Sequence, residues 1–400
     1  MSAKEKTIIT FKRYFLITGL LGHIVLIVFF VLRPDLVDKV SSKVLSKYYA
    51  SAKASERKEM LKFPNLQQEI EAVISPWQPS NEYSVSNLHF VNGKPFESLQ
   101  IALKSLNDGD TLEIAQGVYS EPFEVHQNRL TIIGRGHVVF EKAAIRGKGY
   151  IVNYADDLTI KNIECRGVTV GDRNGACIRQ EGANLTLEHV YFHNSENGVL
   201  EATGKNSKIL IYDSRFEQLG RLGRAHGIYT NTAELYIYDS MFIASKSEGH
   251  EIKSRGPVTE IHGSIIASLS GVDSRLLDVP NGGKLVLDKS LLQQGAMSSN
   301  GQAIGYAQEG RKHTENSITL RENVFIFDRI GYDSMLATDN QFVETAISQN
   351  IIVGEVDTPD LDTSNLIYES REEIGFPEYP FLPNAWCAEQ DKCQIRTQSQ

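Results

Sequence analysis

The sequence has few of the residues that build metal centres, and it lacks several common catalytic motifs. Its 400 residues include only four cysteines, with no C-x-x-C or His-rich spacing to indicate a structural zinc site. Phosphate-cradling glycine motifs and the G-x-S-x-G of serine hydrolases are also missing, which argues against nucleotide use and Ser-His-Asp hydrolysis. No cofactor is therefore predicted.

Positive charge is not in excess either. Lysine and arginine number 41 against 50 acidic residues, a formal net charge of −9. This balance argues against nucleic acid or any other general polyanion as a partner. An acidic ligand would need a local basic patch.

The four cysteines allow two different interpretations. Cys387 and Cys393, in WCAEQDKC, could close a small loop, which would suit an oxidising periplasm. The sequence cannot supply the geometry that such a bond needs. We expect Cys165 and Cys177 to lie buried as free thiols.

One long apolar run stands near the start of the chain. Residues 14–32 form an apolar-rich stretch after a basic one, and at about 1.5 Å per residue they just span a bilayer core of roughly 30 Å. A cleaved signal peptide is the alternative. Arg33, Pro34 and Asp35 follow the run in place of a small-x-small cleavage site, so an uncleaved anchor is favoured.

This anchor sets the predicted domain organisation. Positive charges flank the run on both sides, so counting them does not decide its orientation. We predict a cytoplasmic segment at 1–13, a single inner-membrane span at 14–32 and a juxtamembrane helical spacer or packing arm at 33–80. The domains at 81–370 and 371–400, a main domain and a C-terminal tail, are expected in the periplasm.

The main domain is built of repeated segments. Segments such as LTIKNIEC, ILIYDSRF and ITLRENVF each join an alternating strand to a polar bend and another apolar pair. The third residue of each segment is predicted to face a common core: Ile132, Ile160, Leu187, Ile211, Ile237, Ile261, Leu287, Leu320 and Ile347. The steps between these positions are alike in length, except for one longer step between Leu287 and Leu320.

These spacings favour a parallel β-solenoid. A leucine-rich repeat would show its L-x-x-L-x-L-x-x-N signature, and a propeller blade needs roughly 40 residues or more. Over about residues 88–355 the pattern resembles the right-handed parallel β-helix of the pectate-lyase-like superfamily. Within it, FESLQIALKSLNDGDTLEIAQGVYSEP resembles the capping helix and first rung. The resemblance implies an all-β solenoid of about nine or more rungs, with an N-terminal capping helix. It leaves the activity open, because such helices host lyases, hydrolases, epimerases and binding proteins.

A second strand precedes these segments and carries the candidate site. Ile178, Ile228, Ile252 and Leu277 take equivalent inward positions there. Their outward neighbours on one side are Arg179, Tyr229, Lys253 and Asp278, with Asn231 and Arg255 two residues further on. The corresponding positions before the strand hold His226, His250 and Arg275. His226 should therefore stack on His250, and Tyr229 on Lys253.

Such a basic patch suits a substrate with carboxylates. Abstracting the C5 proton of a uronate builds negative charge onto its carboxylate, and cations stabilise that charge. Lys253 is the candidate base, because a lysine crowded by other cations loses its proton more readily. Arg275 and Arg255 are candidate carboxylate clamps. The candidate proton donors or positioning groups are His226, His250 and Tyr229. Further candidate substrate-binding residues are Arg179, Asn231, Lys246 and Asp278.

The stretch EIKSR also resembles the strand that carries the catalytic lysine in the alginate lyase and chondroitinase B family. There a Lys-Ser pair is followed about one rung later by a catalytic arginine. Here Lys253 and Ser254 are followed by Arg275. That family has two acids upstream of the lysine as calcium ligands. Here Glu248 keeps one of these positions, but Lys246 takes the other. This departure puts calcium in doubt, and no metal site is predicted.

The prediction is thus a membrane-anchored periplasmic polysaccharide lyase or C5-epimerase acting on an acidic polysaccharide. Three alternatives remain. The patch could be a solvated face whose cations are neutralised by Glu181, Glu251 and Asp278. A glycoside hydrolase could use Asp278 with one of the two glutamates. A non-catalytic sugar-binding or scaffold protein could use the tyrosines expected to face outward: Tyr229, Tyr236, Tyr238 and Tyr306. The oligomeric state is open.

Overall fold

The computed structural model describes residues 54–339, 341–384 and 395–396. The predicted span at 14–32 and the pair Cys387 and Cys393 lie outside the described residues. Within the described part, each helix is too short or too polar to cross a membrane.

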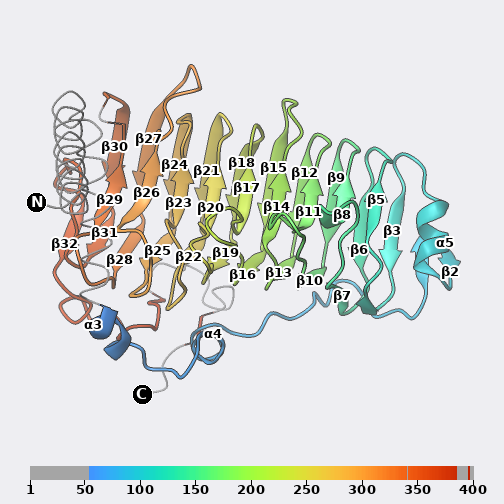
Figure 1. Cartoon of the computed structure of the whole chain (residues 1–400), viewed down its shortest axis with the longest axis horizontal. Coiled ribbons are helices and arrows are strands. Elements are labelled where there is room, and N and C mark those ends of the chain that lie inside the picture. The colour runs from blue at the N-terminus through green and yellow to red at the C-terminus, as the bar shows by residue number, and fades with distance from the viewer. Residues whose placement is uncertain (1–53, 340, 385–394, 397–400) are drawn as a thin grey trace, which may run out of the picture. The chain divides into compact units, whose positions relative to one another are not determined.

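Residues 88–368 wind into a parallel β-helix with three sheets (Figure 1). The chain visits the first, second and third sheets in turn, so each strand pairs with the equivalent strands of the rungs before and after it. Apart from β1, which pairs antiparallel with β2 and β3, the pairing is parallel. The predicted all-β solenoid of about nine or more rungs is confirmed, since the smallest of the three sheets has nine strands.

The first sheet contains β1 (His89–Val91), β2 (Lys94–Phe96), β3 (Thr111–Ile114), β6 (Thr131–Gly134), β9 (Leu158–Lys161), β12 (Leu185–Glu188), β15 (Lys208–Tyr212), β18 (Glu234–Tyr238), β21 (Val258–His262), β24 (Lys284–Asp288), β27 (Ser317–Arg321) and β30 (Glu344–Ser348). The second sheet contains β4 (Gly117–Tyr119), β7 (Val138–Glu141), β10 (Glu164–Arg166), β13 (Tyr191–His193), β16 (Arg215–Glu217), β19 (Met241–Ile243), β22 (Ile265–Ala267), β25 (Leu291–Gln294), β28 (Val324–Phe327), β31 (Ile351–Val353) and β32 (Leu366–Tyr368). The third sheet contains β5 (Phe123–Val125), β8 (Gly149–Asn153), β11 (Ala176–Gln180), β14 (Asn197–Glu201), β17 (Ile228–Thr230), β20 (Ile252–Ser254), β23 (Leu277–Val279), β26 (Gln302–Tyr306) and β29 (Ser334–Ala337). The described helices are α3 (Ala54–Glu59), α4 (Leu66–Val73) and α5 (Leu99–Lys104).

The core is an aliphatic ladder in the predicted register. Ile211 pairs with Ile237, and Ile237 with Ile261, along the first sheet. All nine residues predicted to face the core are buried there. Alternation along each strand explains this result, because every second side chain of a rung must face the interior.

A second ladder fixes the corner between the first and second sheets. At this corner the side-chain oxygen of one rung accepts the backbone N–H of the preceding rung. Ser214 N donates to Ser240 Oγ at 3.1 Å, and Ser240 N donates to Ser264 Oγ at 3.1 Å. Asn323 N continues the series to Asn350 Oδ1 at 3.0 Å. The residue just before each of these corners commonly has a positive φ, for example Asp213 at 43° and Asp239 at 49°.

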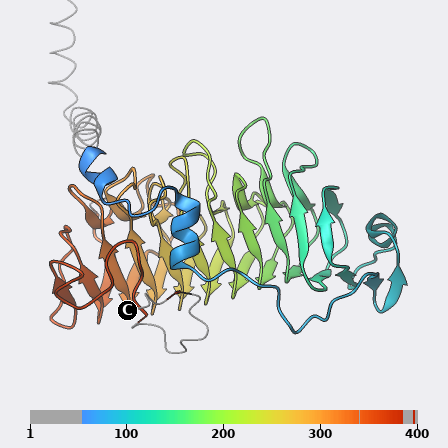
Figure 2. The same cartoon turned by 90° about the horizontal axis from the view of Figure 1, so that it is seen from below.

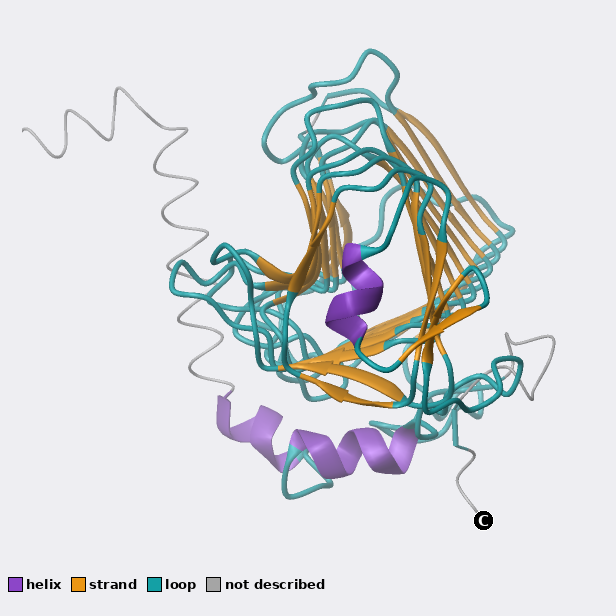
Figure 3. Ribbon diagram, turned by 90° about the vertical axis from the view of Figure 1, so that its right-hand side faces the viewer, coloured by secondary structure: helices purple, strands orange, loops and turns teal. Residues whose placement is uncertain are grey.

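A helix covers the first end of the solenoid core. Helix α5 lies across the end formed by β1 to β3 (Figure 3), at the place predicted for a capping helix, and buries Leu99 and Ala102. Near the other end, residues beyond 370 still belong to the folded unit, since Tyr379 and Leu382 are buried. Arg371 holds this segment through hydrogen bonds of 2.7 and 2.6 Å to Asp328.

Residues 66–85 form an arm that runs along the outside of the β-helix (Figure 2). Helix α4 and its C-cap residue pack Ile70, Val73 and Ile74 against side chains of the second sheet such as Ile243 and Leu291. This part of the predicted 33–80 segment is therefore a packing arm and not a free spacer.

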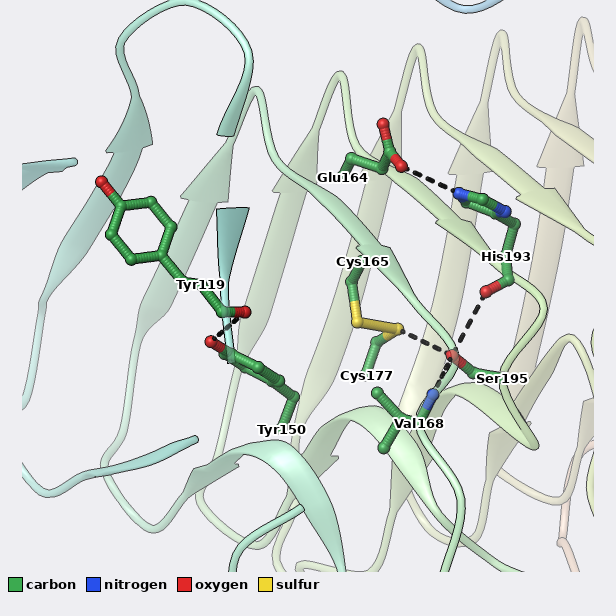
Figure 4. Close-up of a disulfide and its surroundings, with 8 residues drawn as sticks. All are labelled: Tyr119, Tyr150, Glu164, Cys165, Val168, Cys177, His193 and Ser195. Atoms are coloured by element: carbon green, nitrogen blue, oxygen red, sulfur yellow. Dashed lines mark hydrogen bonds and ion pairs between the residues drawn. A yellow bond between two sulfur atoms is a disulfide. The ribbon is translucent and has the colours of Figure 1, made fainter. Parts of the chain in front are cut away.

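Cys165 and Cys177 form a disulfide (Figure 4). Both are buried as predicted, but the prediction that they are free thiols is wrong. They lie on β10 and β11, consecutive strands of one rung that meet at a corner, which brings their Cα atoms to 5.9 Å. Only the rung geometry shows that the chain between them is a surface loop that returns to the same level.

Candidate functional site

The candidate site is built on the outer face of the third sheet. Outward residues of neighbouring rungs pair in a row in which Tyr229 lies beside Lys253, Lys253 beside Asp278, and Asp278 beside Gly305. The predicted stacking of Tyr229 and Lys253 is confirmed.

The row also contains a rung that the sequence comparison skips. β14 lies between β11 and β17, and its Leu200 separates Arg179 from Tyr229. Arg179 is therefore two rungs away from Tyr229. It binds Glu181 at 2.9 Å, and Lys148 binds the same carboxylate.

Asp278 is the centre of the cluster. Its carboxylate is almost completely buried and lies 2.9 Å from Arg275 Nη1, 3.0 Å from Lys253 Nζ and 3.5 Å from His250 Nε2. A buried carboxylate needs such partners, because burial without compensation disfavours its charge. Asp278 thus joins Lys253, Arg275 and His250 in one contact group. Its negative charge offsets the repulsion expected between stacked cations.

Arg275 is fixed from two sides. Its Nε donates to Gln302 Oε1 at 3.1 Å, and its guanidinium lies over Gly305. A Cβ at Gly305 would come within 2.7 Å of Nε, so a larger residue there would displace the guanidinium.

Arg255 forms the outer part of the cluster. Its Nε donates to the Tyr229 hydroxyl at 2.9 Å, while Nη1 and Nη2 donate to the two oxygens of Glu309 at 2.7 and 2.8 Å. Lys253 Nζ lies 3.9 Å from the same carboxylate. The hydrogen bonds to Glu309 raise the pKa of Arg255, and those from Arg255 lower the pKa of Glu309. This is a bidentate arginine–carboxylate pair, the strong form of that interaction.

His226 and His250 stack as predicted, with ring centroids 4.9 Å apart, but they are buried behind the row. His226 Nδ1 accepts the His250 backbone N–H at 3.0 Å, and His250 Nδ1 accepts that of Arg275 at 3.0 Å. Burial lowers the pKa of both rings well below the usual value, and neighbouring cations lower it further. Both are therefore neutral, with the proton on Nε2, and His250 directs that proton toward Asp278.

Glu251 does not belong to the site. The expectation that it pairs with the cations is wrong, because its carboxyl is buried and accepts hydrogen bonds from Ser245 N and Oγ at 2.6 and 2.8 Å. Burial raises the pKa of Glu251 well above its usual range, and nearby Asp273 raises it further. Burial likewise raises the pKa of Asp273 to about 7.

The carboxylate pairs suggested for glycoside hydrolysis are therefore not formed. Glu251 is buried and hydrogen-bonded away from the row. Glu181 directly follows β11, which lies four rung steps of about 4.8 Å from Asp278 on β23, and hydrolysis needs the two carboxyls within about 10 Å.

Asn231 and Lys246 are not part of the contact group around Asp278. Asn231 is exposed, and its backbone N–H donates to Glu201 at 2.7 Å. Lys246 is half-buried, where burial lowers its pKa and Arg221 lowers it further.

Tyr306, expected to face outward, is buried in the core and donates its hydroxyl to the Gly283 carbonyl at 2.6 Å. Among the described residues there is no group of three or more His, Cys, Asp or Glu side chains that could hold a metal ion.

Glu309 and Gln302 are the site residues that sequence reasoning missed. Glu309 lies in the loop after β26, within the one repeat step that is longer than the others, between Leu287 and Leu320. A longer loop beside the candidate strands was a signal that could have found it, because functional residues are often carried on such insertions.

Comparisons with known proteins give two solved structures as matches. No family model matches the chain, and no curated protein matches it. One solved structure is a pectin methylesterase in complex with hexasaccharide VII, at 11% identity, covering 73% of this chain and 96% of that chain with a TM-score of 0.35. The other is a mutant pectin methylesterase in complex with hexasaccharide IV, at 12% identity, with the same coverage and a TM-score of 0.32. Similarity at this level does not extend to activity, and the resemblance around Lys253 stays an interpretation of the sequence.

The buried acids predict a pH dependence of stability. The folded pKa of Asp273 lies above the unfolded value near 3.8, so its contribution is complete below about pH 4 and is lost as the pH rises through 7. Asp273→Asn should reduce this loss. The free energies of unfolding of wild type and variant are measured with urea. The value for wild type minus the value for the variant should fall as the pH rises from 5 to 8. A difference that is constant over that range would contradict the assignment.

Proposed function

We propose that this protein acts on an acidic, uronate-containing polysaccharide at the cluster around Asp278, by β-elimination or C5-epimerisation. The observation that supports the proposal most directly is the contact between Arg255 and Glu309. An arginine fork, with an ammonium group beside it, holds a carboxylate that belongs to a surface loop and is half exposed to solvent. The arginine fork would hold the carboxylate of a uronate in the same way.

Glu309 occupies the position that a substrate carboxylate would take. The backbone of the loop that carries Glu309 is held by two hydrogen bonds. Glu309 N donates to Pro280 O at 2.9 Å, and Lys312 N donates to Asn281 O at 2.8 Å. Only the side chain has to rotate for Arg255 to accept a new partner. Exchange of one carboxylate for another conserves charge, which keeps its free-energy cost small.

The chemistry follows from the groups next to this position. Lys253, once neutral, takes the C5 proton, while Arg255 stabilises the charge that develops on the uronate carboxylate. In elimination the electron pair forms the C4–C5 double bond, the C4–O bond breaks, and a donor such as Tyr229 protonates the leaving oxygen. In epimerisation the donor returns a proton to the opposite face of C5. Arg275 acts on Lys253 only through their shared partner Asp278.

A binding-only function is the second candidate, and one observation favours it. Lys253 contacts the nearly buried carboxylate of Asp278 at 3.0 Å. A lysine already paired in this way suits electrostatic binding of an acidic glycan better than proton abstraction.

The variant Lys253→Ala distinguishes the catalytic function from binding alone. If Lys253 is the base, full-length protein incubated with alginate, chondroitin or pectate should release unsaturated uronate or exchange the C5 proton. The variant should lose this turnover by roughly 10² to 10⁴ while binding within a few-fold of wild type. The matched control is Lys284→Ala, a lysine on the first sheet that pairs with Glu260. Absence of turnover in the wild type, with binding retained, would overturn the catalytic assignment in favour of binding alone. Thermal unfolding of the variant is measured in parallel, because the change leaves Asp278 with fewer partners.

Glu309→Gln tests the carboxylate position itself. The variant removes the competing charge, so affinity for acidic oligosaccharides should rise several-fold, whereas Arg255→Ala should lower it by about tenfold or more. Titration calorimetry at two salt concentrations measures both. Equal affinities in Glu309→Gln and wild type would show that the glycan carboxylate binds elsewhere.

We also propose the predicted location, a single-pass inner-membrane protein with the β-helix in the periplasm. The buried disulfide supports an oxidising compartment. Fractionation should leave the full-length chain in the inner membrane, with Cys165 and Cys177 unreactive to thiol reagents until reduction. Reactive thiols in freshly isolated protein, or a soluble chain lacking its first residues, would contradict this location.

A further inference from the structure

A stack of aromatic rings lies on the outer face of the first sheet, on residues that the proposed function does not use. Tyr212, Tyr238 and His262 occupy the same outward position on β15, β18 and β21. Their rings are nearly parallel, at 9° to one another, with centroids 5.2 and 5.3 Å apart. The three rings form one continuous stack, whose planes are fixed by the rung spacing.

The stack ends at Tyr212. Its register partner on the preceding rung is Glu188, which has no ring to continue the series. One face of Tyr212 is covered by Tyr238, so the other face is turned toward the Glu188 rung, and the residue is 37% exposed.

A pocket of about 400 Å³ lies at this end of the stack. Its floor contains Tyr212, Glu188 and Lys161 of the first sheet, and His189 and Asp213 of the adjoining corner. The opposite wall comes from the arm, through Ser80, Glu82 and Tyr83.

The arm wall is held in place by backbone contacts. Ser80 N donates to Asn162 Oδ1 at 2.8 Å, and Gly136 N donates to Tyr83 O at 3.3 Å. The arm is the segment that runs along the β-helix toward the α5 end (Figure 2). A pocket with two fixed walls is already organised for a ligand, which lowers the entropy cost of binding.

The charges around the pocket decide what it would hold. Lys161 pairs with Glu188, and His189 Nδ1 lies 2.7 Å from Asp213. Glu82 adds a third carboxylate to these two cations, so the lining has a net negative charge. A uronate or phosphate would be repelled, whereas carboxylates are good acceptors for hydroxyl groups.

We propose that this pocket binds a neutral sugar ring of a polysaccharide, stacked on the free face of Tyr212. The C–H face of a pyranose is apolar and would continue the aromatic stack, while its hydroxyls would donate to Glu188 and Asp213. The volume is at the lower end of the range for small-ligand sites, which suits one or two sugar rings. This site is independent of the chemistry proposed for the third sheet.

The experiment is titration calorimetry of the full-length protein with neutral tetrasaccharides built from glucose, mannose or galactose. At least one should bind wild type, and Tyr212→Ala should weaken that binding by about tenfold, the contribution of one aromatic stacking contact. Tyr212→Phe, which keeps the ring, should bind within about threefold of wild type.

The matched control is Tyr236→Ala. Tyr236 is an outward tyrosine of the same sheet, hydrogen-bonded to Glu234 and not part of the pocket lining, and its loss should leave neutral-sugar binding unchanged. Failure of all neutral probes to bind wild type would overturn the inference, as would equal binding by Tyr212→Ala. Arg255→Ala should leave neutral-sugar binding intact, so this result is separate from failure of the acidic-glycan proposal.

Discussion

The register between rungs is the constraint on which the rest of this structure depends. At the corner between the first and second sheets, a serine or asparagine side chain accepts the backbone N–H of the preceding rung, from Val190 and Ser214 on to Asn350 and Asn365. A slip of one residue in any strand would turn its aliphatic side chains outward. From Val190 to Asn365 the corner ladder opposes such slips with one of these hydrogen bonds at each level, and so fixes which outward residues become neighbours.

That register gathers residues of successive repeats into one cluster. Tyr229, Lys253 and Asp278 are far apart in sequence, yet they lie side by side because each follows a core position of its rung. The row resolves the repulsion between cations by placing a nearly buried carboxylate among them. Behind the row, the neutral rings of His226 and His250 accept hydrogen bonds from backbone amides.

The features that the sequence predicts well are those governed by this periodicity. The nine core positions, the parallel solenoid and the stacking of Tyr229 on Lys253 all follow from alternation within a rung and repetition between rungs. The failures come from features that periodicity does not contain. The comparison of strands skips β14 because Asn197–Glu201 carries no charge pattern like that of its neighbours, which places Arg179 too close to the cluster. Free thiols are expected at Cys165 and Cys177 because spacing along the chain does not show that both face the interior at one corner. Glu309 escapes notice because it lies on a loop that interrupts the repeat, although the long step from Leu287 to Leu320 marks that loop.

The division between rigid rungs and inserted loop also bears on how the site could work. Lys253, Asp278 and Arg275 are on or beside paired strands, so their mutual distances are set by the sheet and not by the ligand. Glu309 is different, since its loop backbone is held by Pro280 and Asn281 while its side chain remains half exposed. Arg311 adds a bidentate contact to Asp339 that fixes the loop further on. An acidic glycan would therefore meet a preorganised set of cations whose one movable partner is a carboxylate like its own. Binding then requires rotation of a single side chain and leaves the fold that positions the cations unchanged.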